Sequence, residues 1–132
     1  MNWTTLLCDD RIRSYKKSSS TDLRTEFEKD YHRIIGSASF RRLQDKTQVF
    51  PLDRSDFVRT RLTHSLEVSS LAKSLGQNIS ESIRVNVKDD TFLPEHKAAV
   101  CDILQCAGLI HDIGNPPFGH FGETSIQDWF KQ

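Results

Sequence analysis

Apolar residues recur at three- and four-residue spacing along most of this chain, the pattern of helices that bury one face. In residues 21–43 the pattern predicts a first helix capped by Thr21 or Asp22. A second, shorter helix is predicted from Ser37 to Leu43, after Gly36. The apolar stripe of the first helix consists of Leu23, Phe27, Tyr31, Ile34 and Ile35.

The rest of the chain predicts three further helices. A long one begins near Leu62 and keeps a period of about 3.6 residues as far as Ile83. A polar connection is expected over residues 84–93, and Pro94 fits the first turn of the next helix. The turn at residues 114–117 ends that helix, and the last helix starts at about Gly119. The apolar positions of the long helix include Leu66, Val68, Leu71, Ala72, Leu75 and Ile79. Those of the next helix include Val100, Ile103, Leu104, Ala107 and Ile110, and those of the last helix are Ile126, Trp129 and Phe130.

The remaining segments predict irregular or extended backbone. Residues 1–20 are expected to be irregular, and residues 52–60 a charged connection. Residues 47–51 are expected to be extended, because Pro51 lacks an amide donor and biases Phe50 away from the helix. No strand alternation is convincing. We therefore expect an all-α protein, in which residues 21–132 form one helical domain after an irregular segment of residues 1–20.

Length and composition narrow the class of protein. The 132 residues, 36% apolar and 27% charged, suffice for one domain with a core. No apolar run approaches the roughly 20 residues that cross a bilayer, and no secretory signal is visible, so we expect a cytoplasmic protein without a membrane partner. Of the three cysteines, Cys8, Cys101 and Cys106, the last two lie in an apolar helical stretch and are expected to be core thiols.

Charge is distributed unevenly although the net charge is zero. Residues 11–61 carry an excess of six positive charges, and residues 62–132 an excess of four negative charges. Such a division suits a site where cations meet a phosphorylated ligand beside a metal held by carboxylates. Solvated helix faces are the simpler interpretation, and composition alone favours them.

His111 and Asp112 are the strongest candidates for chemistry. They offer adjacent nitrogen and oxygen ligands at the predicted end of an apolar helix. His64 lies at the start of the long helix, where the helix dipole favours a neutral imidazole, the form that binds metal. Two antiparallel helices can bring these ends together around a divalent ion with open positions for water and substrate. Taken alone, His64 is more simply a capping or surface histidine.

Other polar residues are candidates for supporting roles. His120 and Glu123 are spaced to share one helix face, where they can move protons or orient a water molecule. Arg59 and Arg61 offer guanidinium groups for phosphate oxygens, and Gln48 can both donate to and accept from a sugar or base. Each of these residues also has a purely structural interpretation. His120 and Glu123 can be a helix-start histidine with a first-turn glutamate. The arginines can be solvated surface charges, and Gln48 can satisfy irregular backbone.

Four segments give the chain a family resemblance: residues 40–52, 59–68, 109–123 and 126–130. Together they resemble the HD-domain deoxynucleoside triphosphate triphosphohydrolases, most closely the bacterial dGTPase branch. The resemblance implies a helical HD core and hydrolysis of a deoxynucleoside triphosphate, with dGTP favoured, to deoxynucleoside and inorganic triphosphate. It also implies Mn²⁺ or Mg²⁺, or another transition ion, a homo-oligomeric assembly, and single-stranded DNA as a partner of some members.

The resemblance assigns roles to individual positions. His64, His111 and Asp112 match metal ligands, and His120 and Glu123 match a catalytic pair beside the metal. Gln48 matches a residue that contacts the nucleoside, and Arg61 matches an arginine that faces the phosphates.

One departure from the family pattern limits what this chain is expected to do. The family takes a fourth metal ligand, an aspartate, and further substrate contacts from a region far downstream, and Asp128 does not match that ligand. We therefore expect the N-terminal part of a longer enzyme, one that by itself binds metal weakly and turns over little. The alternatives are a catalytically incomplete HD module that binds nucleotide or nucleic acid, and an HD phosphohydrolase with another phosphate ester as substrate.

Overall fold

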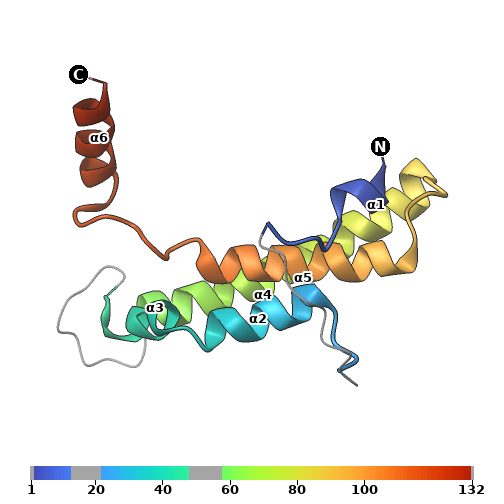
Figure 1. The fold of residues 1–132 in the computed structure, drawn as a ribbon, viewed down its shortest axis with the longest axis horizontal. Helices are drawn as coiled ribbons and strands as arrows, with labels where there is room; N and C mark the ends of the chain where they lie inside the picture. Colours follow the sequence, from blue (N-terminus) through green and yellow to red (C-terminus); the bar gives the residue numbers. More distant parts are fainter. Residues whose placement is uncertain (1, 13–21, 48–57, 132) are drawn as a thin grey trace.

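A computed structural model describes residues 2–12, 22–47 and 58–131, and the helices found there confirm the all-α fold. The long helices α4 (Arg61–Ser82) and α5 (Pro94–Ile110) form an antiparallel pair (Figure 1). Helix α2 (Glu26–Ile35) packs along α5, and the short α3 (Ala38–Arg41) follows α2. Two further helices, α1 (Trp3–Leu6) and α6 (Gly119–Phe130), lie at the two ends of the chain.

Helix α2 begins later than its apolar stripe suggested. Its N-cap is Thr25, whose side chain accepts from the Glu28 amide, while the Glu28 carboxylate accepts from the Thr25 amide. Asp22 therefore does not cap this helix, and Leu23 lies before it with its side chain exposed. Thr21, the alternative cap, lies outside the described residues. This reciprocal cap sets the start of the helix, and the spacing of apolar residues carries no information about it.

The connection after α4 is more ordered than a polar loop. A π-helical turn, η2 (Ile83–Val87), continues α4 through residues 83–87, and Lys88 then adopts the left-handed conformation that ends it. The expected polar connection over residues 84–93 is thus corrected to a much shorter one before Pro94, which occupies the first turn of α5 as predicted.

Burial along α4 follows small residues rather than the leucine stripe. The buried positions are Ser65, Ser69, Gly76 and Ser80, whereas the larger side chains of Leu66, Leu71, Leu75 and Ile79 are 44%, 71%, 54% and 43% exposed. Small side chains let two helix backbones approach closely, so α4 presents its serine and glycine positions to the neighbouring helix α5.

The core lies at the end of the helix pair where α4 begins and α5 ends. Buried Phe40, Leu43 and Leu109 form its centre; Leu43 belongs to a 3₁₀ turn, η1 (Arg42–Asp45), that continues α3. Partly buried Tyr31, Ile34, Ile35, Leu62 and Ile113 surround these three residues. Cys101 is buried in α5 as expected, and Cys106 is partly buried.

The N-terminal segment is tied to the opposite end of the helix pair. Residues 3–6 form the helical turn α1, where irregular backbone was expected. The Trp3 indole donates to the Asp89 carboxylate at 2.9 Å and packs edge-to-face on Phe92, with the two ring centroids 4.9 Å apart. These contacts hold α1 against the short connection that precedes α5.

Helix α6 stands apart from the other helices (Figure 1), and none of its residues is buried. The chain reaches it through the turn predicted at residues 114–117, after which Phe118 and Gly119 both have positive φ angles, 66° and 54°. None of the helices in the described ranges is long and apolar enough to cross a membrane.

Candidate metal centre

His64 is positioned by the start of α4. The Thr60 side chain caps this helix by accepting from the Thr63 amide at 3.2 Å. The Arg61 amide donates to the Lys46 carbonyl at 2.9 Å, and Thr47 pairs with Thr60 in an isolated antiparallel bridge. These contacts tie the beginning of α4 to the end of η1. His64, the fourth residue of α4, is thereby held at this end of the helix pair.

His111 is oriented by the last turn of α5. Its Nδ1 lies 2.7 Å from the Gly108 carbonyl oxygen. A carbonyl can only accept, so Nδ1 carries the proton and donates it. The neutral ring then keeps the lone pair of Nε2 for a ligand, the arrangement that metal-binding histidines use.

Asp112 has one satisfied and one unsatisfied carboxylate oxygen. Its Oδ1 accepts from the Asn115 side-chain amide at 2.6 Å. Its Oδ2 is buried and has no hydrogen-bond partner among the described residues. A buried carboxylate oxygen without a partner is costly, and a cation removes that cost.

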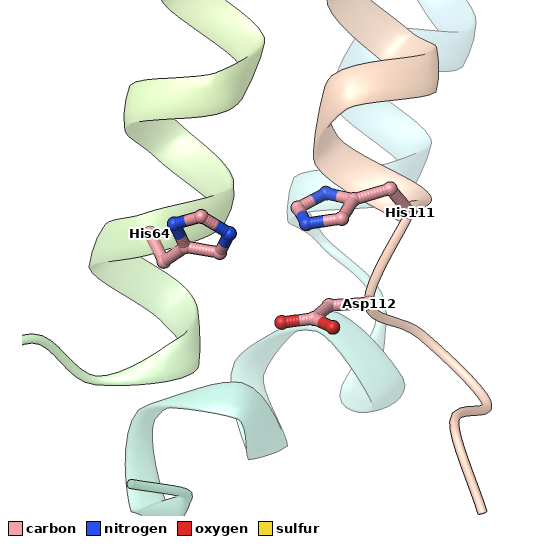
Figure 2. A group of neighbouring side chains, drawn as sticks. All are labelled: His64, His111 and Asp112. Atoms are coloured by element: carbon pink, nitrogen blue, oxygen red, sulfur yellow. The ribbon is translucent and has the colours of Figure 1, made fainter. Parts of the chain in front are cut away.

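These three side chains converge. Figure 2 shows the imidazoles of His64 and His111 facing each other across the gap between α4 and α5, with the Asp112 carboxylate beside them. The ring centroids are 5.2 Å apart, and one ligand atom from each residue lies within 4.8 Å of the other two. Ligand atoms about 2.1 Å from a shared ion lie about 3–4 Å apart, so small side-chain rotations close this group around a divalent ion. Two imidazoles and a carboxylate with an unsatisfied oxygen fit such an ion.

The structure brings no other predicted residue of the described ranges into this group. Arg61 begins α4 and is half-buried, whereas Arg59 is exposed and pairs with Glu67 at 3.1 Å. Gln48 lies outside the described residues.

His120 and Glu123 interact with each other instead. Both lie on α6, and His120 Nδ1 is 3.1 Å from a Glu123 carboxylate oxygen. The His120 side chain is fully exposed, and α6 stands apart from the helix pair that carries His64 and His111. The expected i, i+3 pairing is therefore present, but the structure does not bring this pair to the candidate metal ligands.

Sequence reasoning missed the part played by Asn115. A signal existed, because Asn115 lies three residues after Asp112, at the spacing of one turn. Gly108 stands at the same spacing before His111.

Comparison with known proteins identifies the family of this chain. The model of the HD domain family matches residues 61–132, which contain His64, His111 and Asp112. The chain therefore belongs to the HD domain family, as its motifs predicted.

The names of the relatives describe a narrower group of proteins than the HD domain family does. The chain is 57% identical over 99% of its length to a deoxyguanosinetriphosphate triphosphohydrolase-like protein of Listeria monocytogenes. It is 48% identical over its whole length to one of Synechocystis, and 48% identical over 92% of its length to a deoxyguanosinetriphosphate triphosphohydrolase of Enterobacter. The chain spans 29%, 29% and 25% of the lengths of these relatives.

Proposed function

We propose that this chain carries the metal-binding part of a deoxynucleoside triphosphate triphosphohydrolase, with dGTP as the favoured substrate and deoxynucleoside and inorganic triphosphate as products. The observation that carries the proposal is the convergence of His64, His111 and Asp112, with a buried carboxylate oxygen that lacks a partner. The names of the relatives support the substrate.

In this proposal His64, His111 and Asp112 hold Mn²⁺ or Mg²⁺. A bound divalent ion supplies Lewis-acid polarisation of a phosphoryl oxygen and lowers the pKa of water. Among the chain's own residues, the Gly108 carbonyl accepts a hydrogen bond from His111 Nδ1, which would leave the lone pair of Nε2 available to the ion. Arg61 and Arg59 bind phosphate oxygens, and Gln48 contacts the nucleoside. In the longer protein, residues outside this chain complete the ligand set and the substrate pocket, and the assembly is a homo-oligomer in the cytoplasm.

His120 and Glu123 are the proposed catalytic pair. Glu123 accepts from His120 and thereby fixes its tautomer, which is how a carboxylate prepares an imidazole for proton transfer. Their participation requires α6 to lie closer to the metal ligands than it does in Figure 1.

A second candidate is a non-catalytic HD module that binds nucleotide or single-stranded nucleic acid. The observation in its favour is the separation of α6, with His120 and Glu123, from the group formed by the other three residues.

Metal binding tests the proposal directly. Titration of Mn²⁺ into the chain, followed by the electron paramagnetic resonance signal of the free ion, is expected to show one site. His111→Ala is expected to weaken it by at least about tenfold, because even the loss of a residue that only supports a metal ligand usually weakens binding that much. His32→Ala, which removes an exposed histidine of α2, serves as the control. Equal Mn²⁺ binding by the chain and His111→Ala would contradict the proposal.

The same samples distinguish the two candidates when given the four deoxynucleoside triphosphates with Mn²⁺ or Mg²⁺. Release of triphosphate that depends on His111 supports the hydrolase. The module is supported if nucleotide binding depends on His111 but no triphosphate is released, even when the C-terminal segment of a relative is added as a separate polypeptide.

A further inference from the structure

The three proposed metal ligands come from two separate helix ends, so their spacing must be set by contacts outside the ligand group. His64 belongs to the first turn of α4, while His111 caps α5 and Asp112 follows it. Metal–ligand distances tolerate errors of only about 0.2 Å. Two contacts in the described structure act on this spacing, one made by Gly108 and one by Asn115.

Gly108 lies where α5 comes closest to α4. A Cβ atom at this position would lie 2.6 Å from Ser69 Cα and 2.8 Å from the Ser69 amide nitrogen. Both neighbours are helix backbone, which cannot rotate away, and carbon atoms pack at about 3.5–4.0 Å. Any side chain larger than hydrogen must therefore push the two helices apart by about 1 Å near this point.

That displacement acts on the metal ligands. Ser69 lies five residues after His64 on the same helix, about 7.5 Å along its axis. Gly108 is one turn before His111, and its carbonyl oxygen accepts a hydrogen bond from His111 Nδ1. Gly108 therefore sets the distance between the two imidazoles and also the orientation of one of them.

Asn115 acts on the third ligand. Its side-chain amide holds Asp112 Oδ1 at 2.6 Å, which directs the other oxygen, Oδ2, into the buried position without a partner. The terminal torsion of an aspartate has a broad energy profile, so without this hydrogen bond the carboxylate is free to turn. Asn115 is itself exposed, and its amide has no role in the core.

We propose that Gly108 and Asn115 are positioning residues of the metal centre: Gly108 spaces His64 and His111 and orients the latter, and Asn115 orients Asp112. This inference rests on the proposed metal site. It assigns control of metal affinity to two residues outside the proposed ligand group.

Two matched pairs of variants test it by Mn²⁺ titration, with far-ultraviolet circular dichroism and thermal unfolding as measures of the fold. Asn115→Leu removes the amide beside Asp112. Its control is Asn86→Leu. Asn86 is also exposed, its side-chain amide donates to the Ser82 hydroxyl, and it lies at the far end of the helix pair. Asn115→Leu is expected to weaken Mn²⁺ binding 10- to 100-fold, the usual effect of changing a residue that orients a metal ligand. Asn86→Leu is expected to leave it unchanged.

Gly108→Ala is paired with Gly76→Ala. A Cβ at Gly76 would lie 3.2 Å from the Cα of Cys101 and 3.1 Å from a Leu104 methyl carbon, in the same helix pair but about 18 Å from His64 along α4. Both variants are expected to lower the unfolding temperature, because both disturb the packing of α4 on α5. Only Gly108→Ala is expected to weaken Mn²⁺ binding.

The outcomes separate this inference from the proposed function. Mn²⁺ binding that depends on His111 but is unaffected in Asn115→Leu overturns the role of Asn115, even if Gly108→Ala fails to fold. Equal losses of affinity in Gly108→Ala and Gly76→Ala overturn the role of Gly108, because the effect would then follow stability. Binding that does not depend on His111 removes the proposed metal site itself, and this inference with it.

Discussion

At the scale of single residues, partners three positions away in the sequence hold several of the polar groups in place. Asp112 is held by Asn115, and His111 by the Gly108 carbonyl. Away from the proposed metal site, Glu26 accepts from Lys29 at 2.8 Å and from Arg11 at 2.8 Å. These hydrogen bonds, that of Lys29 first, lower the pKa of the Glu26 carboxyl to about 2. Arg11 also pairs with Asp30, so this ionic cluster ties the N-terminal segment to α2.

Glu26 is therefore expected to make the chain sensitive to acid. Because its pKa is lowered in the folded state, its contribution to stability is complete above about pH 5 and is lost as the pH falls toward 2. Glu26→Gln removes this contribution, so the free energy of unfolding should fall less steeply between pH 5 and 2 than in the wild type. Urea unfolding at several pH values measures it, with the exposed Glu95→Gln as control. Parallel pH profiles for the wild type and Glu26→Gln would show that the cluster does not contribute.

At the scale of secondary structure, hydroxyl caps define where helices begin. Thr25, Ser37 and Thr60 each accept from the amide three residues later, at the starts of α2, α3 and α4. Helix α5 uses a different cap: the Leu93 amide donates to Nδ1 of the buried His96 at 3.0 Å. The cap at Thr60 concerns the proposed metal site most, because it fixes the turn that carries His64.

Loss of this cap is expected to weaken α4 at the metal site. Thr60→Ala should lower the free energy of unfolding by about 1 kcal/mol, since the Thr63 amide loses its acceptor. Thr60→Ser keeps a hydroxyl and should remain close to the wild type. Denaturant unfolding of the three proteins measures the difference. Equal destabilisation by alanine and serine would indicate that the threonine methyl group, and not the cap, is responsible.

At the scale of the whole molecule, large apolar side chains remain at the surface. Leu71 and Leu75 on α4 and Phe121, Trp129 and Phe130 on α6 are each more than half exposed. Leu109, in contrast, is fully buried beside Phe40 and Leu43. The stability of this chain is therefore expected to depend on the core beside the metal site and little on the exposed stripe of α4.

A pair of leucine variants tests this division. Leu109→Ala should cost about 2–5 kcal/mol of unfolding free energy, because it leaves a cavity in the core. Leu71→Gln should change it by no more than about 0.5 kcal/mol, as surface substitutions usually do. Urea unfolding at low protein concentration gives both values. A loss at Leu71 comparable to that at Leu109 would mean that this side of α4 is covered in solution.

The sequence by itself determined the helices and the identity of the candidate ligands. Helical periodicity predicted the bounds of α4 and α5 to within a few residues, because apolar residues spaced three or four positions apart are typical of a helix that buries one face. The adjacency of His111 and Asp112 and the position of His64 marked the proposed metal site, and the segments that contain them carried the family assignment. All of this information is local in the chain.

The tertiary structure alone decided which faces are buried and how the ligands are oriented. Periodicity gives a stripe but not its partner, so it could not show that α4 buries Ser69 and Gly76 while Leu71 stays exposed. The contact that sets this arrangement, Gly108 on Ser69, joins residues far apart in the sequence. The position of α6, which carries His120 and Glu123, likewise depends on tertiary packing. The sequence pattern predicts that this helix exists but not where it lies.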